Sequence, residues 1–467
     1  MKEVKCARIL GVQLDSKLSF LKHISHSKKE ATNRLRIVKT IGGRSKIGNR
    51  KTITTIGKAL VLSKLTYGIE LFSRATWSTI DKMAPNYNSI IRYASGAFCS
   101  SPIQSLLAEA GELPFKHVLI KCLTHSAVKH KEKYNSSATI ARANEWLNEA
   151  AHIELPNIAT LPRVGERRWN DQDPAIDWTM KHALRAGENK HKVLPTFHHL
   201  VNNKYSNHHR IYTDGSVANG LVGIGIFSNC SEECMQLPSI LSIFSAEAAA
   251  LHHAITSTNI NNNTVVFTDS ASVLSALERG KSGNALIQNI EASTRNKPIT
   301  FCWIPGHCGI HGNEKADNLA NVGRQAVISN MDIPSPDVLR HVTASLHQAW
   351  EGAWLNNNQA FLRRIKNSTI PWADNGNRHF QRCLTRLRIG HTRLTHSYRL
   401  ERTDPSICET CNENLTVEHI ILTCRKYSNY RKILDISNSI RTALARDEIE
   451  ENKLISFLCE TKLLELI

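Results

Sequence analysis

Four acidic residues and one histidine, spread over residues 209–326, have the types and positions expected of a metal-dependent reaction centre. They are Asp214, Glu247, Asp269 and Asp317, with His307 ten residues before the last acid. No Lys or Arg immediately neighbours the first three acids, so another cation must offset their repulsion. Carboxylates without accompanying His or Cys suit hard divalent ions, Mg²⁺ first. Two such ions about 3.5–4 Å apart would activate a water and stabilise the attacking and leaving oxygens of a phosphodiester displacement. The set therefore predicts a metal-dependent nuclease.

Short apolar runs place two of these acids at the ends of expected strands. Residues 211–213 lead to Asp214, and residues 265–268 lead to Asp269. Ligands of open α/β sheets collect beyond the carboxyl ends of the strands, so both acids belong at one edge. A helix with an apolar stripe follows Glu247, and this helix would carry that carboxylate across to the same edge.

The remaining signals predict an α/β fold around this edge. The Asn219-Gly220 pair predicts a hairpin, because both residues tolerate positive φ. A return strand is expected over residues 221–227 and a third strand near residues 234–240. A last helix, beginning near residues 312–313, would carry Asp317 within its first two turns.

Each of these residues also has an ordinary structural interpretation. Asp214 before Gly-Ser could form a turn, and Glu247 could be a solvated helix residue. The Asp269-Ser pair could begin a helix as its N-cap. His307 could be a simple loop residue, although its glycine-rich loop and near-neutral pKa suit proton transfer. Coincidence could account for any one of these residues alone. It is a poor explanation for all of them occurring together in this order.

The order of the motifs resembles the type 1 ribonuclease H family. The matching pieces are Tyr-Thr-Asp214-Gly-Ser, Ala-Glu247, Thr-Asp269-Ser and the long motif Trp-Ile-Pro-Gly-His307-Cys-Gly-Ile-His-Gly-Asn-Glu-Lys-Ala-Asp317. The resemblance implies a ribonuclease H-like mixed sheet with helices on both faces over residues 209–327. It further implies that the four acids hold two Mg²⁺ ions (Mn²⁺ as an alternative), that His307 aids turnover, and that the enzyme cuts the RNA strand of RNA–DNA hybrids.

Two features depart from the family pattern. Ile243 and Phe244 stand where many members carry an Asn pair, and Ala271 stands where many carry Gln. Those residues contact the hybrid in the family, and the 2′-OH is what distinguishes RNA from DNA at a site. The basic protrusion that some members insert before the Trp strand is also expected to be absent, because 33 residues separate Asp269 from Trp303.

The positive charge of the chain lies outside this central region. The 467 residues carry a formal net charge of +18, yet residues 209–326 carry −2. Residues 1–60 carry +12 and residues 361–402 carry +8. Basic flanks attract phosphate backbones without reading sequence, whereas the alternative is a merely solvated surface. The lopsided excess favours nucleic acid as the partner.

The N-terminal third is expected to be a basic, mainly helical region. Its pieces, around residues 10–15, 20–24, 59–67 and 101–111, resemble the thumb and connection that follow the palm in non-LTR retrotransposon reverse transcriptases. The paired aspartates of a Tyr-x-Asp-Asp palm motif are absent, so polymerase activity is not expected. The domains expected from the sequence are 1–150 (thumb/connection-like remnant), 151–208 (linker), 209–327 (ribonuclease H), 328–400 (basic helical linker) and 401–467 (zinc knuckle and C-terminal helices).

A second metal site is expected near the C-terminus. Cys408, Cys411, His419 and Cys424 have two, seven and four residues between them, and three thiolates with one imidazole suit tetrahedral Zn²⁺. The spacing is similar to the knuckle downstream of reverse transcriptase in some non-LTR elements. With all four ligands supplied by protein, this site would be structural or binding rather than catalytic.

Compartment and membrane signals favour an intracellular protein. The first residues are charged and lack a following apolar core, and no run of 18 apolar residues exists. Twelve Cys in such a chain suggest reduced thiols and metal rather than disulfides. The sequence thus favours a retrotransposon-derived ribonuclease H. The rival interpretation is a catalytically silent protein that binds nucleic acid through its basic flanks and its zinc knuckle.

Overall fold

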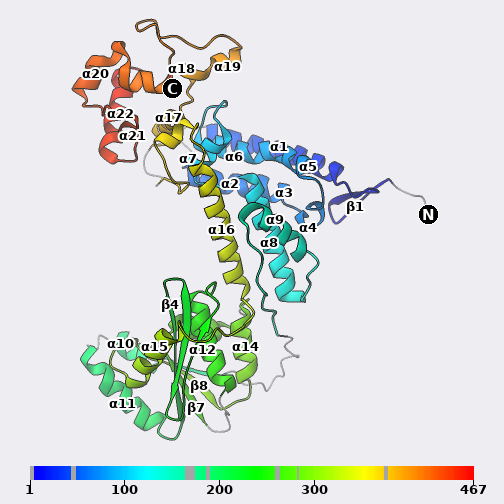
Figure 1. Ribbon diagram of the computed structural model, residues 1–467, viewed down its shortest axis with the longest axis vertical. Helices are drawn as coiled ribbons and strands as arrows, with labels where there is room; N and C mark the ends of the chain where they lie inside the picture. Colours follow the sequence, from blue (N-terminus) through cyan, green and yellow to red (C-terminus); the bar gives the residue numbers. More distant parts are fainter. Residues whose placement is uncertain are drawn as a thin grey trace. The chain divides into compact units, whose positions relative to one another are not determined.

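The computed structural model describes residues 5–43, 49–162, 174–185, 190–257, 263–280, 283–372 and 377–467, which form two compact units (Figure 1). Unit 1 comprises residues 1–123, 145–152 and 344–467, and unit 2 comprises residues 124–144 and 153–343. Each unit is therefore assembled from segments that are far apart in the sequence. None of the described helices combines the length and the apolar character needed to cross a membrane.

Unit 2 is built on a six-stranded mixed sheet with the order β3-β8-β7-β4-β5-β6. The strands are β3 (Ala175–Asp177), β4 (His209–Ala218), β5 (Leu221–Ser228), β6 (Glu232–Leu237), β7 (Thr264–Thr268) and β8 (Ile299–Trp303). The first four in spatial order are parallel, and the β4–β5 and β5–β6 pairs are antiparallel. Asn219 and Gly220 both have positive φ in the two-residue turn between β4 and β5. The hairpin expected from that pair is confirmed.

Helices cover both faces of this sheet. They are α10 (Thr179–Arg185), α11 (Val193–Lys204), α12 (Ile243–Ser257), α13 (Ala271–Arg279), α14 (Ala285–Thr294) and α15 (His311–Gly323), with a 3₁₀ turn η3 (Lys190–Lys192). Residues of α10, α11 and α15 share one apolar core with Tyr212, Phe267 and Cys302. On the opposite face, Gly215 lies against the backbone of α12. The expected α/β fold with a mixed sheet and helices on both faces is confirmed.

Two glycines of β5 allow α15 to lie directly on the sheet. A Cβ at Gly225 would overlap the backbone of Ala316 and Ala320, and a Cβ at Gly223 would overlap Ala320 and Arg324. Backbone atoms cannot move aside as a flexible side chain can, so only glycine permits this approach. The position of α15, which carries Asp317, therefore depends on the absence of side chains at these two positions.

Part of the segment expected as a linker, residues 151–208, is instead folded onto the sheet. β3 pairs in parallel with β8, and α11 packs on the core. Asp177 at the end of β3 is buried and accepts hydrogen bonds from Lys204 Nζ at 2.9 Å and from Tyr205 Oη at 2.5 Å. Burial alone would raise the pKa of Asp177, but these bonds and those from Thr179 outweigh it and lower the pKa to about 2.

Replacing Asp177 by asparagine should destabilise unit 2. The folded-state pKa lies below the ordinary value, so the carboxylate stabilises the fold above about pH 4 and loses this effect as the pH falls toward 2. We expect a loss of about 2–3 kcal/mol at pH 7 and a smaller loss at pH 3. Hydrogen exchange of the β8 amides in urea measures this loss of unfolding free energy. Asp332→Asn is the control, because Asp332 is an exposed acid of the same unit. An equal loss at both pH values would contradict a role for the charged form.

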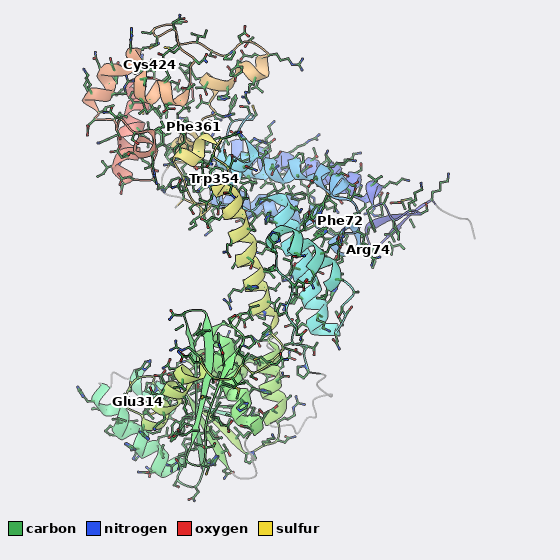
Figure 2. All side chains as sticks on the ribbon, viewed as in Figure 1. Phe72, Arg74, Glu314, Trp354, Phe361 and Cys424 are labelled. Carbon is green, nitrogen blue, oxygen red and sulfur yellow. The ribbon has the colours of Figure 1, made fainter. Side chains whose placement is uncertain are left out.

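Unit 1 is mainly helical and contains residues from both the N-terminal and the C-terminal parts of the chain. Its N-terminal part contains β1 (Cys6–Ile9), β2 (Val12–Asp15), α1 (Leu21–Gly43), α2 (Arg50–Gly57), η1 (Lys58–Leu62), α3 (Ser63–Leu65), α4 (Ile69–Phe72), α5 (Trp77–Ile80), η2 (Asp81–Met83), α6 (Ala84–Ser95) and α7 (Ile103–Ala110). Its C-terminal part contains η4 (Phe361–Arg364), α17 (Arg378–Ile389), α18 (Arg393–His396), α19 (Tyr398–Glu401), η5 (His419–Thr423), η6 (Arg425–Tyr427), α20 (Ser428–Ile433), α21 (Ile440–Ala443) and α22 (Glu448–Glu460). Three helices supply residues to both units: α8 (Phe115–Tyr134), α9 (Ile140–Ala151) and α16 (Ser335–Leu355). In unit 1, Trp354 of α16 (Figure 2) is buried. Its indole N–H donates to the carbonyl of Lys366 at 3.1 Å.

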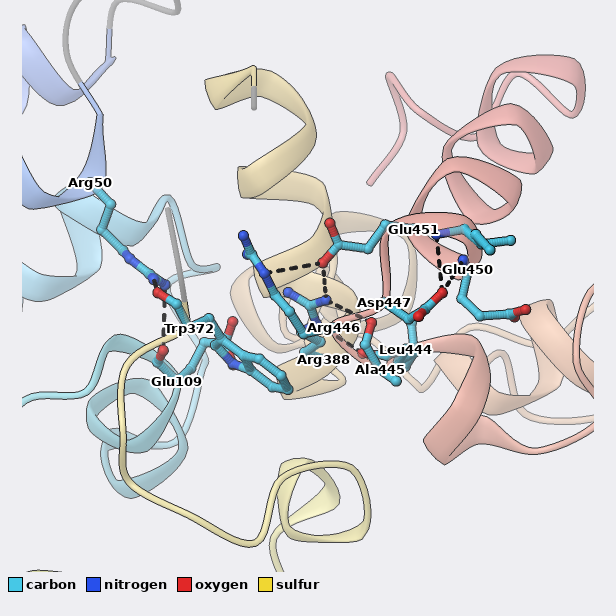
Figure 3. A network of polar contacts seen from close by, with 11 residues as sticks. Arg50, Glu109, Trp372, Arg388, Leu444, Ala445, Arg446, Asp447, Glu450 and Glu451 are labelled. Atoms are coloured by element: carbon cyan, nitrogen blue, oxygen red, sulfur yellow. Dashed lines mark hydrogen bonds and ion pairs between the residues drawn. The ribbon is translucent and has the colours of Figure 1, made fainter. Parts of the chain in front are cut away.

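The basic segment expected as a linker, within residues 328–400, supplies part of the interior of unit 1. Arg388 of α17 is 3 % exposed, lies over the ring of Trp372 and pairs with Glu451 at 2.7 Å (Figure 3). The buried Arg378 donates to the carbonyls of Tyr93 and Ala94. These guanidinium groups are therefore occupied by protein acceptors. The net charge of residues 361–402 overstates what this segment can offer to phosphate groups.

Candidate active site

Asp214 and Asp269 lie side by side where the parallel strands β4 and β7 stop pairing. The last register pair of the two strands is Thr213 with Thr268, and the two aspartates are the next residues. β4 itself does not end at Asp214, as the sequence suggested, but continues to Ala218 in antiparallel pairing with β5. The expected location at the carboxyl edge of the parallel strands holds, because that edge is defined by the end of β7.

Glu247 reaches this edge from α12. A Cβ built on Gly215 would lie 2.7 Å from the backbone nitrogen of Glu247, so glycine beside Asp214 allows the helix to approach β4. The Ser270 hydroxyl donates a hydrogen bond to Oε2 of Glu247. Ser270 is also the N-cap of α13 and accepts from the amide of Val273. One serine thus fixes the start of a helix and the orientation of a carboxylate.

Asp317 is held on α15 by an amide that also contacts β4. Asn321, one turn later, donates from Nδ2 to Asp317 Oδ1 at 3.2 Å. The Asn321 side-chain oxygen accepts from the Ser216 hydroxyl at 2.8 Å. This link couples the rotamer of Asp317 to the strand that carries Asp214.

His307 lies in the loop between β8 and α15 and points into solvent. Its side chain is 82 % exposed, and its Nδ1 is 4.0 Å from Asp317 Oδ2. Its backbone has φ of +53°, a left-handed conformation that is uncommon outside glycine. The preceding Gly306 lies against the Asp269 carboxylate, where a Cβ would meet Oδ2 at 2.5 Å. The loop therefore places an accessible imidazole at the rim of the acidic cluster.

The acids perturb one another because they are partly removed from water. Burial raises the pKa of Asp214 to about 8, and the nearby Asp269 and Asp317 add to this shift. Burial also raises the pKa of Asp269 and of Glu247, with Asp269 contributing to the shift of Glu247. All four carboxylates are thus within electrostatic reach of the cluster, and their full ionisation requires a compensating positive charge.

The residues present fit a divalent cation. Among the described residues, no Lys or Arg pairs with any of the four carboxylates; Lys315 on α15 lies instead 3.9 Å from Glu232. Asn313 donates to Asp269 Oδ2 at 3.4 Å, and its own side-chain oxygen is buried without a hydrogen-bond partner. Uncompensated carboxylates beside an unsatisfied amide oxygen form an oxygen-rich donor set of the kind that Mg²⁺ prefers.

Several supporting residues were not assigned by sequence reasoning. Ser270, Asn313 and Asn321 each hydrogen-bond one of the acids, and the indole of Trp303 donates to the carbonyl of Asp269 at 3.0 Å. The spacing of Asn321 four residues after Asp317 on a helix is the one local signal that could have revealed such a contact. The others depend on contacts between separate elements.

The three positions that depart from the family pattern offer no amide group. Ile243 is 46 % exposed at the start of α12, Phe244 is half-buried beside it, and Ala271 begins α13. The surface beside Glu247 is therefore more apolar than in family members that carry the Asn pair and the Gln at these positions.

The four expected zinc ligands form one cluster in unit 1. The ligand atoms of Cys408, Cys411, His419 and Cys424 all lie within 4.8 Å of one another, and in the described ranges no other three or more His, Cys, Asp and Glu residues, the four more widely spaced carboxylates of unit 2 included, are this close together. The sulfur of Cys424 is 3.7 Å from that of Cys408 and 3.9 Å from that of Cys411. A tetrahedron with Zn–S bonds of about 2.3 Å has edges of about 3.8 Å. The cluster already has the size of a zinc site.

The histidine of this cluster is oriented as a ligand. Nδ1 of His419 lies 3.0 Å from the Glu413 carboxylate. Its Nε2 is buried and has no hydrogen-bond partner. A ligating histidine commonly donates its other ring N–H to a carboxylate, which fixes the ring and frees one nitrogen for the metal. This orphaned nitrogen is therefore consistent with a zinc ligand.

Comparison with known proteins identifies the central part of unit 2. Residues 206–325 match the family model of RNase H, a span that contains the four acids and His307. A search of curated proteins gave no match for this chain. The chain thus contains an RNase H domain, and the resemblance drawn from the motifs is confirmed at the level of the RNase H family. The family hydrolyses the RNA strand of RNA–DNA hybrids and typically uses divalent metals such as Mg²⁺.

Proposed function

We propose that this protein is a type 1 ribonuclease H that cuts RNA internally in RNA–DNA hybrids by a two-metal mechanism. The observation that carries the proposal is the cluster of Asp214, Glu247, Asp269 and Asp317, whose charges no Lys or Arg of the described residues offsets. Without a cation such acids are partly neutralised by protons, as the raised pKa of Asp214 indicates, so their full ionisation calls for a bound cation. A surface that only binds a polyanion would instead carry Lys and Arg at these positions.

In this proposal the four carboxylates hold two Mg²⁺ ions, with Mn²⁺ as an alternative. Bound there, the ions supply an activated water and stabilise charge on the scissile phosphate. Ser270 and Asn321 orient Glu247 and Asp317, so these two carboxylates reach the substrate site already positioned.

His307 is proposed to move a proton at the leaving oxygen or at the attacking water. Its exposure and its distance of 4.0 Å from Asp317 allow the imidazole to swing between solvent and the cluster. A positioned general acid or base contributes about a hundredfold or more to the rate. We therefore assign it to turnover rather than to metal binding.

The chemistry of the products tests this proposal. An RNA–DNA hybrid labelled on the RNA 5′ end should be cut in Mg²⁺ and remain intact in EDTA. Water attack leaves fragments with a 3′-hydroxyl, which poly(A) polymerase extends, and a 5′-phosphate on the other side. Fragments that end in a 2′,3′-cyclic phosphate, or cleavage that persists in EDTA, would contradict metal-assisted hydrolysis.

We further propose that the Cys408, Cys411, His419 and Cys424 cluster binds one Zn²⁺ as a structural or nucleic-acid-binding knuckle. The purified chain should contain about one zinc per molecule, because four protein ligands close a tetrahedral site. Cys424→Ser should lose this zinc and melt at a lower temperature, as metal-binding energy contributes to folding. Metal analysis with Cys459→Ser, an exposed thiol outside the cluster, is the control. Full zinc content in Cys424→Ser would rule out this ligand set.

A second candidate function is nucleic-acid binding without catalysis. Ile243, Phe244 and Ala271 favour it, since the amides that contact the hybrid in the family are absent there. We also propose a retrotransposon origin, supported by the pieces within residues 1–150 that resemble a reverse transcriptase thumb and connection. Of the sequence-based domains we retain residues 1–150, 209–327 and 401–467 as proposed functional parts, whereas the expected linkers 151–208 and 328–400 contribute folded elements to the two units.

A further inference from the structure

An open groove in unit 1 is lined by basic side chains from different elements. The lining residues of α1 are Leu21, Lys22, Ile24, Ser25, His26, Lys28 and Lys29; β2 adds Gln13, α5 adds Thr79 and η2 adds Lys82. No Asp or Glu is among the residues that line it. All the residues belong to unit 1, so the groove is separate from the RNase H domain.

The four lysines of this groove have exposed side chains and no acidic partner. Lys22, Lys28, Lys29 and Lys82 are all exposed. Within the described parts of the chain, none of them has a carboxylate within ion-pair distance, whereas Lys58, Lys116 and Lys453 of the same unit do. Four like charges that converge on one groove repel one another, and their potential favours an anion.

The charges continue as a row along α1. Lys22, Lys29 and Arg36 follow one another at intervals of seven residues, so they lie on nearly the same face of the helix with about 10 Å between successive members. All three are exposed, and the described part of α1 contains a single acid, Glu30. A straight row of cations matches an extended polyanion better than it matches a compact acidic patch.

We propose that this groove binds the phosphate backbone of a nucleic acid. No Phe, Tyr or Trp lines it, and His26 supplies its one aromatic ring, so the groove lacks the series of aromatic side chains on which successive bases of a single strand stack. Lysine ammonium groups contact phosphates as point charges without reading sequence. The groove thus provides a second, sequence-independent contact with nucleic acid, carried by a unit that contains none of the catalytic acids.

Salt-dependent binding of the full-length chain tests the proposal. The probe is a fluorescent 20-base-pair DNA duplex, which RNase H activity does not cut, and the buffer contains EDTA. Each phosphate contact contributes about 0.9 to the slope of log K against log salt. The variant with Lys22, Lys28, Lys29 and Lys82 changed to Gln should lose about 3 to 4 from this slope and bind at least about tenfold more weakly near 0.1 M salt.

Two further variants separate the groove from general charge. One changes Lys5, Lys133, Lys432 and Lys462 to Gln, which removes the same net charge from exposed positions elsewhere, and it should keep nearly the full slope. The other places Arg at the four groove positions and should bind like the natural protein. Equal loss in the groove and control variants would overturn the proposal. The proposal would also be overturned if the groove variant kept the salt slope for DNA but no longer sedimented with phosphatidylserine vesicles. That result would assign the groove to a membrane surface. Cleavage of a hybrid, measured separately, reports on the nuclease and not on the groove.

Discussion

Asp269→Asn should abolish cleavage of an RNA–DNA hybrid while the protein still folds and binds the hybrid. Asp269 lies between the other acids: it shifts the pKa of both Asp214 and Glu247 and accepts from Asn313. Removing its charge would remove a ligand of the proposed Mg²⁺ ions, whose charge stabilisation is worth several kcal/mol, so we expect a loss of about a thousandfold or more in rate. Single-turnover cleavage in Mg²⁺ measures this loss.

The same substitution separates the two candidate functions. A nuclease loses activity and keeps its affinity, whereas a silent binding protein has no activity to lose. Asp332→Asn, at an exposed acid of the same unit, should leave the rate within about twofold of the natural enzyme, because exposed charges contribute little. A rate in Asp269→Asn that equals that of Asp332→Asn would exclude Asp269 from the reaction centre.

Gly225→Val should unfold or severely loosen unit 2. Its side chain would enter the space held by the backbone of Ala316 and Ala320, and α15 can make room only by leaving the sheet. Overpacking of a core typically costs about 1–3 kcal/mol, and a collision with backbone belongs at or above the top of that range. Displacement of α15 also carries Asp317 away from the other acids, so activity should fall even in molecules that remain folded.

Thermal unfolding and hydrogen exchange of α15 measure this effect. Gly283→Ala is the matched control, since Gly283 is exposed in the same unit with no atom within 4 Å of an added Cβ. That variant should melt within about a degree of the natural protein, as surface substitutions usually change stability by less than 0.5 kcal/mol. A Gly225→Val protein with unchanged melting would show that α15 is not seated on β5 in solution.

The location of the proposed reaction centre in the fold could be predicted from the sequence because its signals are local. Apolar runs that end at Asp214 and Asp269 identified the edge of the sheet, and the Asn219-Gly220 pair identified the hairpin beside it. The spacing of Cys408, Cys411, His419 and Cys424 likewise identified a cluster that the structure brings together. Each of these signals lies within a few residues and follows from backbone geometry or ligand chemistry.

The features that escaped prediction depend on distant partners. β3 has only three residues, and its place follows from pairing with β8 more than a hundred residues later. Asp177 looked like a residue of a polar tether, although Lys204 and Tyr205 satisfy it in the folded state. Arg388 belongs to a basic segment that was expected to attract phosphate backbones, and its protein acceptors at residues 444, 445 and 451 could not be foreseen because they lie far along the chain. Composition gives the number of charged side chains, whereas the fold determines which of them remain free to contact a partner.

Substrate discrimination by the full-length chain tests the central claim most directly, because β3 and α11 belong to the same unit as the nuclease sheet. Labelled RNA would be supplied as an RNA–DNA hybrid, as a single strand and as duplex RNA, each with Mg²⁺. The account predicts rapid internal cutting of the hybrid and little cutting of the other two, despite Ile243, Phe244 and Ala271. Equal cutting of all three, or no cutting by folded protein that still binds the hybrid, would contradict the assignment as a hybrid-specific ribonuclease H.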